Sequence, residues 1–287
     1  MVWSRVCLIK WDVKLRRAKI GEKINFFYLE NDRYIGQRAA VGKYEPYETQ
    51  LILRQAKVGG TVIDVGANIG YYTLILADKV GKNGKVYAFE PDKINFEILE
   101  KNIKENKLKN VVAIKAAIGS KNESKILYKS EENLGDHKLY KPKTPAKKRE
   151  KVKIVRLDSF IKEKMDLIKI DTQGWEPEVI EGAKEMIKKN KPVIFLEYSP
   201  ASYREAGMSG KRMMEFLRKV YRKIWWIDEW LYIYKNLDQK EIDKICATNK
   251  TGYADLWMKA KFCINRKKIW VIISCINLRL RPRKEKK

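Results

Sequence analysis

A regular alternation of apolar runs and amphipathic stretches, which begins at Thr61, constrains the fold of this chain more than any other feature. Short β-rich runs predict strands, and the 3.6-residue periodicity between them predicts helices. The expected strands are 61–65, 85–90, 110–118, 166–172, 192–199, 224–228 and 252–260. The expected helices are 71–80, 92–108, the short 157–164, 176–190 and 210–221. This order predicts an α/β fold with a doubly wound, mainly parallel sheet between two layers of helices.

The segments outside this alternation divide the chain into three parts. Residues 1–60 are expected to form an N-terminal β-rich cap, because "GEKINFFYLENDRYIG" (21–36) is typical of a β-hairpin. Residues 61–260 would form the main domain, in which the polar stretch 119–150 indicates a short hairpin with an exposed loop. Residues 261–287 would form a basic and hydrophobic C-terminal tail.

The chain is strongly basic, with a formal net charge of +26 at pH 7. Residues 1–20 carry six Lys or Arg against one Asp, and residues 261–287 carry ten against one Glu. Such a balance favours anionic partners, namely nucleic acid, anionic lipid or an acidic glycan. Lysines on solvated helix faces give the same composition. Charge alone therefore leaves the class of partner open.

Cysteine and histidine are scarce in the sequence. The four cysteines form no C-x-x-C pair, and the only histidine is His137. This pattern is typical of neither a zinc site nor a disulfide framework, so we expect no bound metal. Reduced thiols, together with a charged N-terminal stretch that lacks a signal-peptide pattern, predict a cytoplasmic protein.

The C-terminal tail contains an apolar run, 269–280, between two basic clusters. A membrane-spanning helix needs roughly 20 apolar residues, so this run is too short to be one. The segment 269–287 could instead lie in the membrane interface at the inner face, with its cations on anionic headgroups. The alternative is a final strand or helix packed on the core, and the sequence leaves both interpretations open.

The turn after the first expected strand, "DVGANIG" (64–70), carries the clearest chemistry. It matches neither the dinucleotide motif G-x-G-x-x-G nor the phosphate-binding motif G-x-x-x-x-G-K-[ST]. Gly66 and Gly70 let a ligand approach the backbone, whereas Asp64 would attract a cation and repel a diphosphate. Glu90 ends the second expected strand, where a carboxylate is suited to bind two ribose hydroxyls. A ligand with a ribose and a cationic end but no phosphate is S-adenosylmethionine.

Several motifs in the same order resemble the FkbM family of S-adenosylmethionine-dependent methyltransferases. They are "GKYEPYET", "DVGANIGYYT", "FEPD" and "KIDTQGWEPEVIEGA". The resemblance covers about 42–198 and, more faintly, the chain up to Ala260. It implies the class I methyltransferase fold, a Rossmann-like sheet of seven strands in three layers. In that fold the last strand is antiparallel and lies between the fifth and the sixth.

The resemblance also implies which residues bind the cofactor. Those beside its amino-acid and sugar parts would be Asp64, Gly66, Ala67, Asn68 and Gly70. By the same resemblance, Glu90 would take the ribose hydroxyls, and Ala117, with Ala116 before it, would pass near the adenine. Gln173 would complete the set after the fourth strand.

Asp171 and His137 are the candidates for a base that removes a proton from an acceptor hydroxyl. Asp171 matches the family signature after the fourth strand, which often reads D-x-E-G; here Gln173 stands in place of the Glu. The alternative for Asp171 is a cap of the following helix. The alternative for His137 is a hydrogen bond within its polar loop.

The resemblance implies methylation of a hydroxyl of a sugar, glycan or secondary metabolite. A glycan carried on a lipid diphosphate would suit the basic ends of the chain. The basic surface also leaves open an RNA or protein methyltransferase, although an N-P-P-Y-like motif is missing after the fourth strand. A third alternative is a binding module that keeps the fold without activity. The sequence gives no indication of an oligomeric state.

Overall fold

The computed structural model describes residues 14–131, 133–249 and 251–260. The segment 269–287, for which we predict membrane association, lies outside these described residues. Within the described ranges, no helix is both long enough and apolar enough to cross a membrane.

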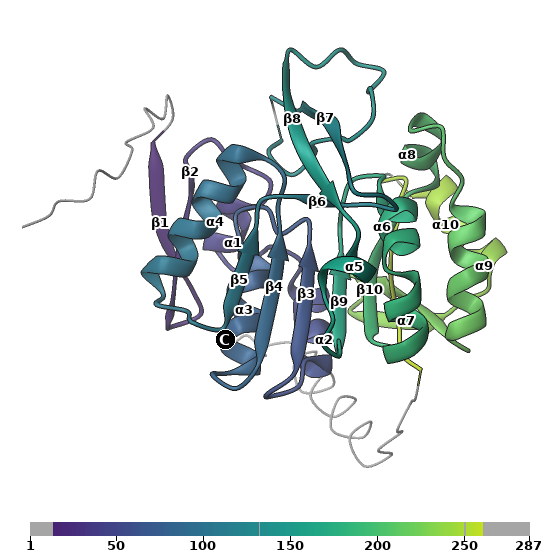
Figure 1. Ribbon diagram of the computed structural model, residues 1–287, viewed down its shortest axis with the longest axis horizontal. Helices are drawn as coiled ribbons and strands as arrows, with labels where there is room; N and C mark the ends of the chain where they lie inside the picture. Colours follow the sequence, from purple (N-terminus) through teal and green to yellow (C-terminus); the bar gives the residue numbers. More distant parts are fainter. Residues whose placement is uncertain (1–13, 132, 250, 261–287) are drawn as a thin grey trace, which may run out of the picture.

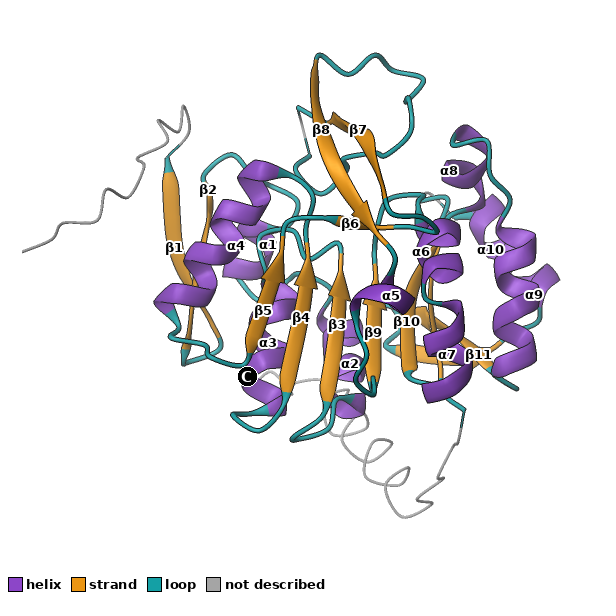
Figure 2. Ribbon diagram, viewed as in Figure 1, coloured by secondary structure: helices purple, strands orange, loops and turns teal. Residues whose placement is uncertain are grey.

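The largest element is an eight-stranded sheet. The carboxyl ends of its parallel strands lie toward the top of Figure 2. Its order from one edge to the other is β5 (Val111–Ile114), β4 (Lys85–Phe89), β3 (Thr61–Val65), β9 (Leu167–Ile170), β10 (Val193–Tyr198), β13 (Ala254–Met258), β11 (Ile224–Asp228) and β12 (Ile233–Asn236). The first five strands are mutually parallel, and β13 pairs antiparallel with both β10 and β11. The class I order with its inserted antiparallel strand is therefore confirmed. β12 extends the edge by one strand that we did not predict.

Helices cover both faces of the sheet and make the three predicted layers (Figure 1). Alternate residues of one strand point to opposite faces, so Val62 and Ile63 belong to two different apolar clusters. The cluster of Val62 includes residues of α2 (Pro46–Gln55), α3 (Tyr71–Val80) and α4 (Lys93–Glu105). The cluster of Ile63 includes residues of α6 (Glu176–Gly182), α7 (Lys184–Asn190), α9 (Gly210–Val220) and α10 (Gln239–Thr248).

The expected strand 110–118 is wrong in extent, because the chain bends after β5. The amide of Ala116 donates to the carbonyl of Ile114 at 2.9 Å, which closes a tight turn. The following β6 (Ala117–Ile118) joins a second sheet with β7 (Glu123–Lys129) and β8 (Lys148–Val155). The predicted hairpin is thus present as β7 and β8, and Figure 1 shows it above the carboxyl ends of β3 and β4.

The expected helix 176–190 is likewise interrupted, at Ala183 between α6 and α7. Gly182 ends α6 against the backbone of Gly119, where a Cβ atom would collide with the Gly119 carbonyl oxygen. Two short helices complete this part of the chain, namely α5 (Leu157–Phe160) and α8 (Pro200–Glu205). After Thr61, the helices α8 and α10 were not expected from the sequence, whereas α5 matches the short helix expected at 157–164.

The N-terminal part consists of β1 (Leu15–Ile20), β2 (Ile24–Leu29), α1 (Gly36–Ala40) and α2. The hairpin therefore begins earlier than the predicted 21–36. Two asparagines of the α4 end attach it to the main domain. Asn102 accepts from the Phe27 amide at 2.7 Å, and Asn106 accepts from the Asn25 amide at 2.8 Å.

Candidate functional site

The turn after β3 is built by backbone conformations that place glycine and asparagine at fixed positions. Gly66 has φ 82°, and a Cβ atom there would collide with the carbonyl oxygen of Asp171 at the end of β9. Asn68 (φ 50°) and Gly70 (φ 97°) are also left-handed, and Gly70 is the N-cap of α3. Gly70 packs against Leu99 and lines neither of the two cavities described below. Its role in this structure is the turn and the packing of α4.

Asp64 is a buried carboxylate with one free oxygen. Asp64 lies on β3 and is 1% exposed. Its Oδ2 accepts a hydrogen bond from Thr73 Oγ1 at 2.6 Å. Its Oδ1 has no hydrogen-bond partner among the described residues. Asp64 lines a small cavity together with Ala67, Tyr44, Tyr72 and Asp171. An acceptor oxygen left free in such a place suits an ammonium or sulfonium group, since a buried carboxylate without a partner is costly.

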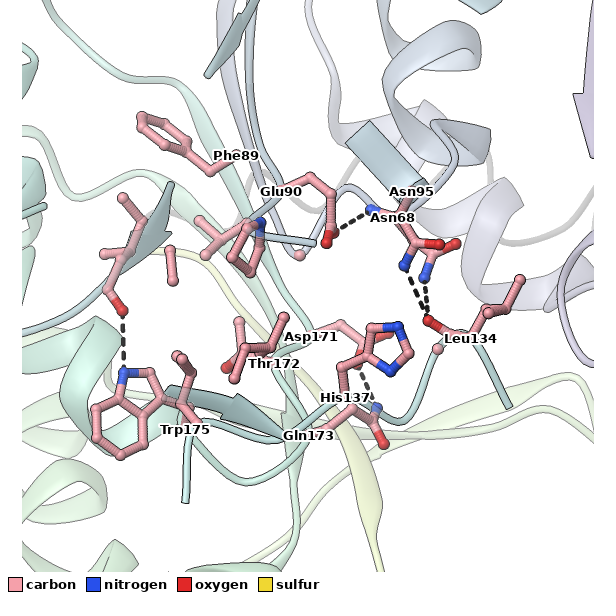
Figure 3. A pocket seen from close by; sticks show the side chains of 18 residues that line it. Asn68, Phe89, Glu90, Asn95, Leu134, His137, Asp171, Thr172, Gln173 and Trp175 are labelled. Carbon is pink, nitrogen blue, oxygen red and sulfur yellow. Dashed lines mark hydrogen bonds between the residues drawn. The ribbon is translucent and has the colours of Figure 1, made fainter. Parts of the chain in front are cut away.

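Glu90 lines a second cavity, shown in Figure 3. It is 5% exposed, and its two oxygens accept from the backbone amides of Asn68 and Asp92, each at 2.8 Å. Burial raises its pKa to about 8, and the neighbouring Asp92 adds to this effect. Ala117, at the start of β6, lines the same cavity and presents only a methyl group. A carboxylate oriented by two amides beside an apolar wall is suited to a sugar with a flat base attached.

Asp171 lies where the two cavities meet, because it lines both of them together with Gly66, Asn68 and Gly135. Its Oδ2 is 3.0 Å from Lys169 Nζ, and its Oδ1 accepts from Gln173 Nε2 at 2.7 Å. The alternative role of Asp171 as a helix cap is wrong, because the N-cap of α6 is Trp175. Gln173, with φ 53°, also lines the Glu90 cavity.

Glu176 fixes the loop that carries Asp171, and the sequence analysis missed it. Its carboxylate is fully buried and accepts from the Thr172 amide at 2.8 Å, the Thr172 hydroxyl at 2.9 Å and the Gly174 amide at 3.0 Å. Burial raises its pKa to about 7. The available signal was a Glu in the first turn of the expected helix, two residues after Gly174.

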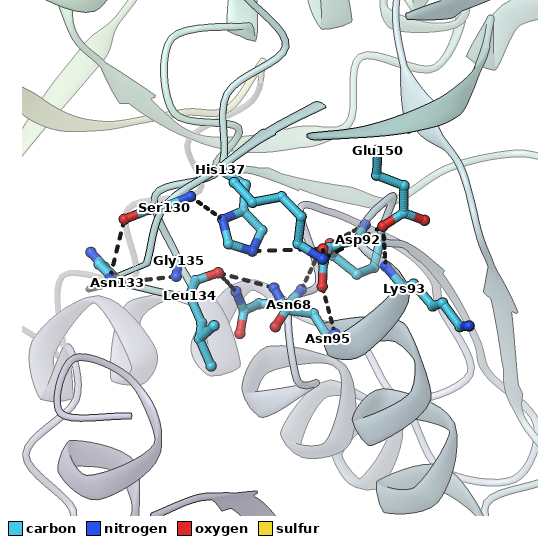
Figure 4. A network of polar contacts seen from close by, with 12 residues as sticks. Asn68, Asp92, Lys93, Asn95, Ser130, Asn133, Leu134, Gly135, His137 and Glu150 are labelled. Atoms are coloured by element: carbon cyan, nitrogen blue, oxygen red, sulfur yellow. Dashed lines mark hydrogen bonds and ion pairs between the residues drawn. The ribbon is translucent and has the colours of Figure 1, made fainter. Parts of the chain in front are cut away.

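His137 lines the Glu90 cavity but its ring is engaged in a loop network (Figure 4). Its Nδ1 accepts from the Ser130 amide at 3.1 Å, so the neutral ring carries its proton on Nε2. Nε2 lies 3.7 Å from Asp92 Oδ2, which is also paired with Lys129. Burial lowers the pKa of His137 despite the attraction of Asp92. Nε2 has no hydrogen-bond partner among the described residues. Because Nδ1 already accepts from Ser130 and Nε2 carries the proton, the neutral ring has no free lone pair for an acceptor proton.

The His137 loop crosses the cavity at Leu134 and Gly135. The carbonyl oxygen of Leu134 accepts from Asn68 Nδ2 at 3.0 Å and from Asn95 Nδ2 at 2.9 Å. Gly135 lines both cavities. Asn95, at the first turn of α4, is therefore another residue of the site that the sequence analysis missed.

The residues fit the cofactor inferred from the sequence. The free Asp64 oxygen suits its cationic end, the amide-held Glu90 suits its ribose, and Gly66 admits no side chain at the turn. The strand order is that of the class I fold of S-adenosylmethionine-dependent methyltransferases. A model of the methyltransferase FkbM domain matches residues 64–223, more than half of the chain. The chain therefore belongs to the FkbM methyltransferase family.

Known proteins resemble parts of the chain. A probable cobalt-precorrin-6B C(15)-methyltransferase (decarboxylating) from Sulfurisphaera tokodaii is 41% identical over 66 residues, which are 22% of this chain and 34% of that protein. The crystal structure of methyltransferase FkbM from Methylobacillus flagellatus KT matches 69% of this chain and 43% of its own, with TM-score 0.46 and 16% identity. A Pyrococcus abyssi tRNA (uracil-54, C5)-methyltransferase in complex with S-adenosyl-L-homocysteine matches 88% of this chain and 45% of its own, with TM-score 0.45 and 13% identity. This chain thus spans about a third of the curated relative and less than half of each of these two structures.

Proposed function

We propose that the protein transfers the methyl group of S-adenosylmethionine to a hydroxyl oxygen of an uncharged acceptor, such as a sugar, a glycan or a secondary metabolite. The observation that carries this proposal is the position of Asp171. Its carboxylate lies at the junction of the two cavities and is fixed through both oxygens by Lys169 and Gln173.

The bound cofactor would supply a methyl group attached to a sulfonium sulfur. On transfer of this methyl to the acceptor oxygen, the rest of the cofactor would leave as a neutral thioether. The protein residues then have two tasks, alignment and proton removal. Asp64 and Glu90 orient the two ends of the cofactor, and Asp171 accepts the hydroxyl proton. The loop around Leu134 and Gly135 excludes water from the junction.

The cluster of acidic groups around Asp171 favours an uncharged acceptor. Glu197 and Asp255 are paired in register on β10 and β13, and Glu48 lies on the neighbouring α2. Burial raises the pKa of each of these three carboxyls well above its usual range, and nearby acidic groups, Asp171 among them, add to that effect. The raised pKa values indicate that negative charge is disfavoured here, so a phosphate would add to that cost, whereas sugar hydroxyls can hydrogen-bond to the carboxyl groups without adding charge.

The second candidate is a methyltransferase acting on RNA, and the net charge of +26 favours it. The test is incubation of the purified full-length protein with tritiated S-adenosylmethionine and an extract of the source organism, separated into small-molecule, glycan, RNA and protein fractions. We expect label in the small-molecule or glycan fraction, and none when Asp171→Asn protein is used. Label confined to RNA or protein would overturn the proposed acceptor, and a protein that binds no cofactor would be a binding module.

A further inference from the structure

Lys169 is a buried cation at the start of the motif 169–183, and the sequence analysis assigns it no role. It is 4% exposed and is the one lysine or arginine in the buried set of the described residues. Its neighbours on β9 are the apolar Leu167, Ile168 and Ile170. An apolar residue would satisfy such a position at lower cost, because burial of an ion pair rarely stabilises a fold on balance. A role in the site is therefore the simpler account of this lysine.

The contacts of Lys169 all point to the methyl-transfer end of the cleft. Its Nζ lies 3.0 Å from Asp171 Oδ2 and 4.6 Å from the centre of the Tyr72 ring. Its backbone is in register with Asp64 on β3, and its residue lines the cavity that Asp64 and Asp171 share.

The carboxylates around Lys169 keep it charged. Burial alone would lower the pKa of Lys169, but Asp171, Glu45, Asp64 and Glu48 together raise it above its usual value. Lys169 is therefore an ammonium at any pH at which the protein works, and it cannot accept the acceptor's proton. Its remaining chemical capacities are to donate hydrogen bonds and to supply positive charge.

We propose that Lys169 is a positioning residue for the methyl transfer, which holds the Asp171 carboxylate at the junction of the cavities and offsets the negative charge around the sulfonium. The catalytic part of this inference rests on the proposed function. With Lys169 on Oδ2 and Gln173 on Oδ1, rotation of the Asp171 side chain is blocked. The charge part is independent of the acceptor, because it concerns only which ligand the cavity holds.

The charge part is tested by calorimetric binding of S-adenosylmethionine, whose sulfonium is cationic, and S-adenosylhomocysteine, whose sulfur is neutral. Lys169→Met removes a positive charge from the cavity, so it should shift the ratio of the two Kd values by about tenfold in favour of the cationic ligand. Lys169→Arg should keep the ratio of the unaltered protein. An unchanged ratio in folded Lys169→Met protein would overturn the charge role.

Lys85 provides a matched control. Lys85 is also a strand residue. Its Nζ lies 3.0 Å from a carboxylate oxygen of Glu163 and 4.6 Å from the centre of the Tyr87 ring. It is, however, on the amino end of β4, away from both cavities. Lys85→Met should leave the ratio of Kd values unchanged. If Lys169→Met is not folded at 25 °C, Lys169→Gln takes its place, with the same expected shift.

The positioning part is tested by a double-mutant cycle with the acceptor identified above. Lys169→Met should lower kcat about 100-fold, and Lys169→Arg should restore most of it. If Lys169 acts through Asp171, the double variant Lys169→Met/Asp171→Asn loses no more kcat than Asp171→Asn alone. Multiplicative losses, or no recovery of kcat in Lys169→Arg, would contradict the positioning role.

Discussion

The two ends of the cleft both contain buried carboxylates, but the protein satisfies them in different ways. Glu90 is held by two backbone amides, and burial raises its pKa to about 8. Asp64 and Asp171 share a cavity with the buried ammonium of Lys169. Backbone amides orient the Glu90 carboxyl group toward hydroxyl groups and add no charge of their own. An ammonium group, in contrast, stabilises the ionised form of a carboxylate that is shielded from water. The comparison assigns binding of a neutral sugar to one end and charge-dependent chemistry to the other.

The largest effect is expected at the charged end. Asp171→Asn removes the proton acceptor at nearly unchanged side-chain size, and only one of its two side-chain positions can still accept from Lys169 or Gln173. We therefore expect kcat to fall by about 10² to 10⁴. The Kd of S-adenosylhomocysteine should change little. Asp166→Asn is the control, because Asp166 pairs with Lys57 at the amino end of β9. A kcat loss of less than about tenfold for Asp171→Asn would contradict the role of Asp171 as the proton acceptor.

A smaller effect on a different quantity is expected at the sugar end. Glu90→Gln turns one acceptor oxygen into an amide that faces a backbone N–H, so S-adenosylhomocysteine should bind roughly 10- to 100-fold more weakly. The value of kcat at saturating cofactor should fall much less. Glu163→Gln, at the opposite end of the sheet, should leave the Kd unchanged. Equal losses in kcat and in affinity would erase the distinction between the two ends.

Glu90 should also make stability depend on pH. Its folded pKa of about 8 lies above its ordinary value of 4.5, so the folded state binds more protons between these values. The stabilisation is therefore present below pH 4.5 and is lost as pH rises through about 8. The free energy of unfolding from urea titrations should fall by up to about 4 kcal/mol more in the wild type than in Glu90→Gln over this window. Parallel pH curves for the two proteins would contradict the raised pKa.

The smallest effect is expected for His137, because we assign it no part in the methyl transfer or in proton removal. Asn at this position can still accept from the Ser130 amide, so His137→Asn should change kcat less than about fivefold. His137→Ala loses that acceptor and should weaken cofactor binding several-fold by loosening the Leu134 loop. A 100-fold loss of kcat in His137→Asn would restore His137 as the base.

The sequence predicted the sheet well, because parallel strands buried on both faces leave long apolar runs and the glycine turn marks the first of them. It failed where a contact between distant segments decides the backbone. The bend at Ala116 and the break at Ala183 both adjust the chain around the β6 crossing, and no local pattern shows this. β12 was missed because most of its residues are exposed.

The site was predicted in part. Asp64, Glu90 and Asp171 follow from strand ends, which meet at one edge of a parallel sheet. Lys169 and Glu176 did not follow, since their roles depend on burial, and a lysine in a short apolar strand is ambiguous until its partners are known. The side-chain partners of Asp171 and the tautomer of His137 also needed the three-dimensional contacts.

Calorimetric titration of the wild type, Asp64→Asn and Glu90→Gln with S-adenosylmethionine and S-adenosylhomocysteine tests the central claim most directly. We predict one site per chain with Kd values roughly in the micromolar range for the wild type. Glu90→Gln should weaken both ligands equally, whereas Asp64→Asn should weaken the cationic S-adenosylmethionine more than the neutral S-adenosylhomocysteine. No binding by the wild type, or the same ligand preference in all three proteins, would contradict the account of a cleft with one neutral and one charged end.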